Sequence, residues 1–399
     1  MESRRWQAIL ILLVLALTYG LIFMERTAPG LVTPELMRQF HLTPGILSLM
    51  TIGQYLVYAV LQIPVALGAR RFRAEHLLVV GTVFDGMGTV MFGLSHSFSM
   101  VVVSRVLVGL GDALIWLNIV AVLARWFSFG IFGRVLGITG MSGNVGALVA
   151  TIPLAVWVEA SGWRAPFAVM GWTLIALAAA SFVIFWRLRP MHPEVRVPQE
   201  RAPWDQVFRQ RRELWAVALG HFGLMGPFLG FVSLYAVPYL RTNYGLNEVA
   251  ASTFLAFGLA GALLGGPPAG MLADKWGVRR PYAAVTVLNA LVWVVLAVFR
   301  LPLSLMAVLF ILLGAANGAA VLTFATVRER FPNPAQGLAS GIANTAGFLG
   351  AVLVPAGMGL ALSLHASPRV ELMVAVPFAL SASLVGVLLK TKPQKSATF

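Results

Sequence analysis

The segment Gly270-Met-Leu-Ala-Asp274-Lys275-Trp-Gly277-Val-Arg279-Arg280 is a short charged loop between two long apolar stretches. Pro268 to Gly277 aligns with Pro64 to Arg73, which follows an earlier apolar stretch, at an offset of 204 residues. Glycine permits a tight turn between two helices, and the basic residues favour the cytoplasmic side of a membrane. The loop therefore predicts a helical membrane protein in which one helix–loop–helix unit occurs twice.

A second internal match supports this repeat. Gly137 and Asn144 have counterparts in Gly337 and Asn344, at an offset of 200 residues. Two distant matches with nearly the same offset predict two related halves. We therefore expect an all-α polytopic membrane protein of two pseudo-symmetric six-helix bundles.

The composition requires a lipid environment for most of the surface. Of the 399 residues, 59% are hydrophobic and 11% are charged, whereas a soluble domain carries roughly 25% charged residues. The chain has no cysteine, so disulfides and thiolate metal sites are excluded. Residues 6–24 are longer than the apolar core of a signal peptide and lack a cleavage site, so we expect them to remain as the first helix.

Stretches of about 20 apolar residues predict membrane-spanning helices. We expect twelve of them, at residues 6–29, 44–68, 75–95, 98–123, 132–158, 163–188, 213–240, 247–273, 281–300, 303–326, 335–364 and 369–390. The longest polar segment divides these helices into two groups of six. The predicted organisation is a six-helix bundle at 1–188, a cytoplasmic linker at 189–212, and a second bundle with a short cytoplasmic tail at 213–399.

The net charge of +14 raises the question of nucleic acid binding. The basic residues, however, lie in short clusters between apolar stretches. With the N-terminus in the cytoplasm, 22 of the 29 Lys and Arg residues fall on the cytoplasmic side, as the positive-inside rule requires. We expect a multi-pass protein of the cell inner membrane with both termini cytoplasmic and no nucleic acid partner.

The charged loop of 270–280 is similar to the signature G-x-L-x-D-[RK]-x-G-x-[RK]-[RK] of the major facilitator superfamily. Three other segments resemble its anion:cation symporter branch, which includes proton symporters for sugar acids and organic anions. They are Arg105-Val-Leu-Val-Gly109-Leu-Gly111-Asp112-Ala113, the pair Glu25-Arg26, and Tyr58, Gln62 and Pro64 in a Y-x-x-x-Q-x-P spacing. The resemblance implies the fold of that superfamily, transport by alternating access, and a gating role for Gly270, Asp274, Lys275, Gly277, Arg279 and Arg280.

The N-terminal copy of the signature departs from the pattern. Arg70 stands where the signature has Asp, and Arg73 where it has Gly. We therefore expect the acid-to-helix latch to be missing on that side.

Four ionisable residues at membrane depth are the main candidates for function, because such residues usually face a cavity. Arg105 and Asp112 are seven residues apart, so they share a helix face but lie about 10.5 Å apart, and each needs another partner. Following the resemblance, Asp112 and Glu25 are assigned to proton coupling, and Arg26 to substrate binding, where a guanidinium holds a carboxylate with two hydrogen bonds. Arg105 is assigned to substrate binding or to shifting the pKa of a nearby carboxylate. The alternatives are a structural polar network and, for Glu25 and Arg26, a hydrated position at the membrane interface.

Other polar residues of the helices are weaker candidates, for which packing is the alternative. His221 is assigned to proton coupling because it titrates near neutral pH, and Asp85 is expected to have a structural partner. The glycines at 109, 111, 137, 140, 143 and 146 are expected at close helix contacts. The remaining predicted substrate contacts are Tyr55, Tyr58, Gln62, Asn144, Tyr235 and Asn344.

These observations predict a secondary transporter, most simply a proton-coupled symporter of a small organic anion such as a carboxylate or sugar acid. The chain has no P-loop motif or nucleophile–base arrangement, so we expect no enzyme activity, cofactor or metal. Its expected partners are the anion, protons and membrane lipid, and the expected state is a monomer. An exporter of amphipathic compounds and a non-transporting receptor on the same scaffold are the alternatives.

Overall fold

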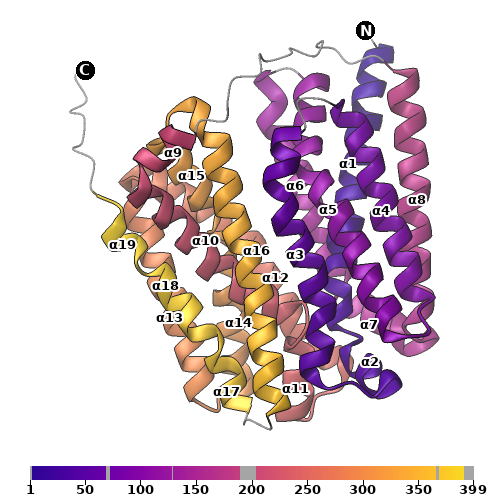
Figure 1. The fold of residues 1–399 in the computed structure, drawn as a ribbon, viewed down its shortest axis with the longest axis vertical. Coiled ribbons are helices and arrows are strands. Elements are labelled where there is room, and N and C mark those ends of the chain that lie inside the picture. Colours follow the sequence, from indigo (N-terminus) through magenta and orange to yellow (C-terminus); the bar gives the residue numbers. More distant parts are fainter. Residues whose placement is uncertain (1, 69–71, 128, 189–203, 365–367, 391–399) are drawn as a thin grey trace.

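The computed structural model describes residues 2–68, 72–127, 129–188, 204–364 and 368–390, and these residues fold into helices without strands (Figure 1). The helices before the central polar segment are α1 (Glu2–Thr27), η1 (Ala28–Gly30), α2 (Thr33–Phe40), α3 (Pro44–Gly68), α4 (Ala74–Gly93), α5 (Phe98–Trp126), α6 (Phe129–Val149), α7 (Ile152–Ser161) and α8 (Arg164–Arg187). Those after it are α9 (Trp204–Arg209), α10 (Arg211–Val232), α11 (Ala236–Tyr244), α12 (Glu248–Trp276), α13 (Arg279–Val298), α14 (Leu303–Gly318), α15 (Val321–Arg330), α16 (Asn333–Ser363), α17 (Pro368–Met373), α18 (Ala375–Ala382) and α19 (Val385–Leu388).

The predicted set of membrane spans is confirmed. Within the described residues, 11 helical segments are long and apolar enough to cross a membrane, and the bent pair α6–α7 raises the number to 12. The two parts of that pair meet at an angle of 43°. Pro153 lies in the first turn of α7 and lacks the N–H group that would continue the hydrogen-bond ladder of α6.

Other predicted helices are also interrupted. The seventh span is broken between α10 and α11, and the twelfth consists of three short helices. Helix α9 (Trp204–Arg209) and the start of α10 lie inside the predicted linker at 189–212, and the division of the chain at this linker stays a prediction. Val207 of α9 is buried against α10 and α16, which explains why this end of the linker is helical. Residues 189–203, and Arg70 with its expected loss of the latch, lie outside the described residues.

Small residues bring α1 and α6 into close contact. A Cβ atom at Gly146 would collide with the backbone of Gly20, and one at Gly143 would lie 2.8 Å from Tyr19. Gly109 and Gly111 of α5 make similar contacts with α3 and α4. The same prediction is wrong for Gly137 and Gly140, which have open space or a contact at 4.0 Å around the position of a Cβ atom.

We call α1–α8 the N-terminal half and α9–α19 the C-terminal half. The start of α1 and the short helix α9 lie at one end of the molecule, and α2, α11 and α17 lie at the other (Figure 1). At that opposite end the two halves are joined by hydrogen bonds. They run from Thr33 to the Leu234 carbonyl (3.2 Å), from Tyr235 to the Pro44 carbonyl (2.8 Å) and from the Gly45 N–H to Ser363 (3.0 Å).

We call the end that contains α2, α11 and α17 the closed end. Beyond it, α3 and α16 run side by side along the interface between the halves (Figure 1). Gln62 accepts a hydrogen bond from Asn344 at 3.0 Å, and Thr345 donates to the Ala59 carbonyl at 3.4 Å. The candidate site lies beside this interface between α3 and α16.

Candidate functional site

Arg26 near the end of α1 and Asp112 in the middle of α5 form a buried ion pair. Arg26 Nη2 lies 2.6 Å from Asp112 Oδ1, and the two side chains are 9% and 0% exposed. The interfacial, hydrated position considered for Glu25 and Arg26 is wrong, since these residues are 0% and 8% exposed. Two charges removed from water in this way remain ionised only while they compensate each other.

Arg105 forms a second buried ion pair with Glu25, and Gln54 of α3 joins the two pairs. Arg105 donates to Glu25 Oε1 and to Gln54 Oε1, while Gln54 Nε2 donates to Asp112 Oδ2 at 2.8 Å. The result is a continuous chain of polar groups from Glu25 through Arg105, Gln54 and Asp112 to Arg26. With all four ionisable groups charged, this polar chain has two positive and two negative charges and is neutral.

Helix geometry explains why the pairs are formed in this combination. Arg105 and Asp112 share one face of α5 at a rise of about 10.5 Å, which is too far for a direct bond. Glu25 and Arg26 are consecutive in α1, so their side chains point about 100° apart and reach different levels of α5. Each residue of α1 therefore pairs with a different charge of α5.

Aromatic rings from both halves lie around the Arg26 guanidinium. Its central carbon lies 4.7 Å from the ring centroid of Phe23, 5.5 Å from that of Tyr58 and 5.8 Å from that of Phe348. Phe348 belongs to α16, and its ring centroid is 3.9 Å from that of Tyr58 in α3. Tyr55 approaches Phe348 as well, with centroids 5.7 Å apart. Arg26 thus lies at the interface between the halves, where the faces of aromatic rings attract cations.

The other predicted site residues lie in separate places. His221 Nδ1 is 3.3 Å from Thr323 Oγ1 and its ring packs on Phe324. Its side chain also interacts with Asn344, the residue of α16 that donates to Gln62 of α3. Tyr235 lies at the closed end, and Asn144 is a partly exposed residue of α6. None of the hydrogen bonds formed by the described residues connects these three side chains to the polar chain of α1, α3 and α5.

The charged loop after α12 has the turn that its sequence predicts. Gly277 has φ of 74°, in the left-handed region that favours glycine, and it ends α12. Arg279 Nη2 donates to the Gly386 carbonyl of α19 at 2.8 Å. Asp274 and Lys275 are exposed, and Asp274 has no hydrogen bond or ion pair with a described residue. The loop is therefore attached through Arg279 in this conformation.

Asp85 of α4 is fully buried, and neither of its carboxyl oxygens has a hydrogen-bond partner among the described residues. The expected structural partner is absent there, and that prediction is wrong. Asp85 packs against Gly111 of α5, next to Asp112 in the chain. An unpaired carboxylate is too costly to bury, so we assign Asp85 as a neutral acid that adds no charge to the polar chain.

The two buried acids should respond differently to removal of their charge. Glu25→Gln leaves Arg105 with an uncompensated buried charge and should cost about 3–5 kcal/mol. Asp85→Asn replaces a neutral acid by an amide of similar shape and should cost less than about 1 kcal/mol. Thermal melting of the purified variants in detergent measures both effects. A large destabilisation by Asp85→Asn would show that this residue carries a charge.

The sequence analysis missed Gln54, the residue that joins the two ion pairs. A usable signal was present, because Gln54, Tyr58 and Gln62 follow each other at intervals of four residues on one face of α3. An amide at membrane depth is less conspicuous than a charge, and its partners depend on the packing of three helices. Among the described residues, no group of three or more His, Cys, Asp or Glu side chains is arranged to hold a metal ion.

Comparison with known proteins identifies the family of this chain. The model of the Major Facilitator Superfamily matches residues 15–264 and 227–399. The probable sulfoacetate transporter of Cupriavidus necator is 25% identical over 67% of this chain and 65% of its own length. The nitrite extrusion protein of Bacillus subtilis is 27% identical over 60% of this chain and 59% of its own length. The matched regions thus span about three fifths of these relatives.

A solved structure supports the fold over nearly the whole chain. It is that of a bacterial homologue of the human lysosomal transporter Spinster, in an inward-facing and unoccupied conformation. It matches with a TM-score of 0.72 and 18% identity, and covers 96% of this chain and 94% of that one. The repeated helices, the loop after α12 and the match to the family model lead to one conclusion: the chain belongs to the Major Facilitator Superfamily of membrane transporters.

Proposed function

We propose that this protein is a proton-coupled symporter of a small organic anion and works by alternating access. The observation that carries the proposal is the buried Arg26–Asp112 pair at the interface between the halves. Protonation of Asp112 removes the negative charge that compensates Arg26. The guanidinium then needs another anion, and a substrate carboxylate fits its planar, two-pronged geometry.

The charges of the polar chain provide a rule for coupling. The empty, deprotonated site is neutral, with Arg26 and Arg105 balanced by Glu25 and Asp112. A proton on Asp112 together with one bound monoanion also leaves the site neutral. The protonated empty site carries +1 and the deprotonated loaded site carries −1, and burying such a charge costs about 2.5–3.5 kcal/mol. We expect only the two neutral states to cross easily between conformations, which couples one proton to each negative charge.

The surroundings of Arg26 suit an organic anion. Arg26 Nε has no hydrogen-bond partner among the described residues, so a donor remains for a ligand. Phe23, Tyr58 and Phe348 lie within 5.8 Å of the guanidinium carbon, measured to their ring centroids, and offer apolar faces for a hydrocarbon body. Tyr55 and Gln62 of α3 and Asn344 of α16 are proposed as further contacts to the substrate.

The proposal includes an orientation and a division of the chain. We place both termini in the cytoplasm of the inner membrane and the closed end outside. The six spans on each side of residues 189–203 would move as two bundles around the site. The sulfoacetate relative, named for the transport of an organic anion, supports the anion reading.

Uptake into proteoliposomes tests the proposal. A pH gradient, acidic outside, should drive accumulation of a monoanionic carboxylate such as gluconate above its external concentration. Collapse of the gradient with a protonophore should abolish the accumulation. Uptake that is unaffected by the gradient would exclude proton coupling.

Two alternatives make different predictions in the same assay. An exporter should move substrate out of the vesicles, and the nitrite extrusion relative gives this direction some support. If its substrates were amphipathic, Arg26→Ala should leave transport nearly intact. A receptor should bind a ligand and transport nothing. Measuring the binding and the direction of transport of carboxylates, nitrite and lipophilic cations distinguishes the three functions.

A further inference from the structure

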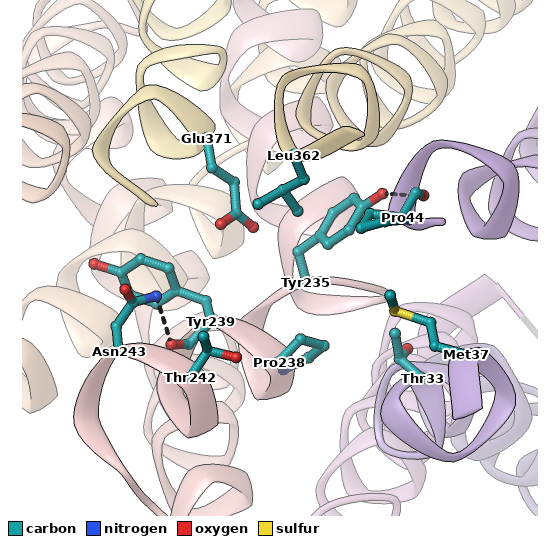
Figure 2. Close-up of a pocket in the computed structure, with 10 residues that line it drawn as sticks. All are labelled: Thr33, Met37, Pro44, Tyr235, Pro238, Tyr239, Thr242, Asn243, Leu362 and Glu371. Atoms are coloured by element: carbon teal, nitrogen blue, oxygen red, sulfur yellow. Dashed lines mark hydrogen bonds between the residues drawn. The ribbon is translucent and has the colours of Figure 1, made fainter. Parts of the chain in front are cut away.

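A cavity lies at the closed end, away from the polar chain of α1, α3 and α5. Its volume is about 160 Å³, close to the roughly 150 Å³ of an apolar protein cavity that holds benzene. Both halves contribute to its walls (Figure 2). The lining residues are Thr33, Met37 and Pro44 from the N-terminal half and Tyr235, Pro238, Tyr239, Thr242, Asn243, Leu362 and Glu371 from the C-terminal half.

Glu371 of α17 is the one ionisable carboxylate among the lining residues. It is 3% exposed, and among the described residues its carboxylate has no hydrogen bond or ion pair. Figure 2 shows the carboxylate directed into the space between Tyr235 and Tyr239. Without a partner, the buried Glu371 is a neutral acid for the same reason as Asp85. Unlike Asp85 it faces a cavity, so it can give up its proton when a cation enters and compensates the carboxylate.

The other lining residues indicate the chemistry of the rest of the ligand. Pro44, Pro238 and Leu362 are apolar, and the rings of Tyr235 and Tyr239 offer faces that attract a positive charge. The hydroxyl group of Tyr235 is already engaged with the Pro44 carbonyl at 2.8 Å. We propose that this cavity binds a small monovalent organic amine, with Glu371 as its counter-ion and the apolar walls around its hydrocarbon body.

The chemistry favours an amine over a metal ion or an anion. Hard metal ions such as Ca²⁺ require about six to eight oxygen ligands, whereas this cavity offers one carboxylate, hydroxyl groups and an amide. An anion would be repelled by Glu371, and none of the described residues that line the cavity has a cationic side chain to compensate. An ammonium group needs one charge and a few acceptors, and the side chains of Thr242 and Asn243 carry oxygen atoms for this purpose.

The position of the cavity predicts what binding would do. A ligand in contact with Met37 and Pro44 on one side and Glu371 on the other joins the two halves at the closed end. Such a ligand binds the closed arrangement better than one in which the walls have separated, so it should favour the closed end. This inference concerns a site distinct from Arg26 and Asp112 and does not depend on the proposed substrate.

Thermal shift of the full-length protein with benzylamine tests the inference. At pH 8, benzylamine in large excess over its dissociation constant should raise the melting temperature by about 2–4 °C. Benzyl alcohol, of the same shape without the charge, should have no effect. Glu371→Gln should weaken benzylamine binding at least about tenfold, since it removes the charge and keeps the shape.

Two further variants make the result decisive. Glu248→Gln is the matched control, because Glu248 is an acid at the same end whose partner is Arg241 at 3.3 Å, and it should bind benzylamine normally. Leu362→Trp should fill the cavity and remove the shift even if Glu371→Gln fails to fold. Absence of a benzylamine shift in the folded wild type would overturn the inference. An equal shift with benzyl alcohol, or an unchanged shift in Glu371→Gln, would overturn it as well.

Discussion

Asp112→Asn should abolish pH-driven accumulation of the anion while exchange of internal for external anion continues. Asparagine imitates the protonated acid, so Arg26 is permanently free to bind a carboxylate. The loaded carrier is then neutral and crosses between conformations, but the empty carrier retains an uncompensated Arg26. Burying this charge costs about 2.5–3.5 kcal/mol, and that cost should slow the return of the empty carrier roughly a hundredfold.

Net uptake and exchange of a labelled carboxylate in proteoliposomes measure the two activities separately. We expect net uptake to fall about a hundredfold and exchange to change less than about threefold. Glu35→Gln is the control, because Glu35 is an exposed acid paired with Arg38 at 2.8 Å, and it should retain both activities. Normal accumulation by Asp112→Asn would remove this residue from the coupling mechanism.

Arg26→Ala should remove binding and transport of carboxylates. Hydrogen bonds to charged groups contribute about 1.5–3 kcal/mol each, so loss of a two-pronged contact should weaken anion binding by at least about a hundredfold. Arg26→Lys keeps the charge but not the planar fork, and it should lose about tenfold. Binding is measured by thermal shift with a carboxylate panel.

The single variant also leaves Asp112 buried without its partner, so loss of binding could reflect a damaged fold. The double variant Arg26→Ala/Asp112→Asn separates the two effects, because it removes both charges of the pair. It should regain much of the thermal stability but none of the anion binding. Recovery of binding in the double variant would show that Arg26 is a structural partner of Asp112 and does not hold the substrate.

Much of the fold could be predicted from the sequence, because membrane spans are a matter of apolar length. The breaks inside spans were harder to predict. Pro153 is a strong signal for the bend between α6 and α7, but Pro267 and Pro268 lie inside the uninterrupted α12. Proline therefore marks positions where a helix can bend, and the packing of neighbouring helices decides whether it does.

The charged residues of the site could be predicted from the sequence, but the ion pairs and hydrogen bonds between them could not. Charge at membrane depth singled out Arg26 and Asp112, whereas their mutual pairing depends on how α1 packs on α5. Gln54 and Glu371 were missed for related reasons. An amide is inconspicuous in a span, and Glu371 stands near the start of a predicted helix, where a charge is ordinarily hydrated.

Proton movement during anion uptake tests the central claim most directly. A monoanionic carboxylate would be added outside proteoliposomes that contain the wild-type protein and have no pH gradient. A pH dye would measure the pH of the external medium. We predict a rise in external pH that corresponds to one proton per anion taken up, with a rate independent of membrane potential, and no such rise with Asp112→Asn. Uptake of the anion without a matching loss of external protons would contradict coupling through the Arg26–Asp112 pair.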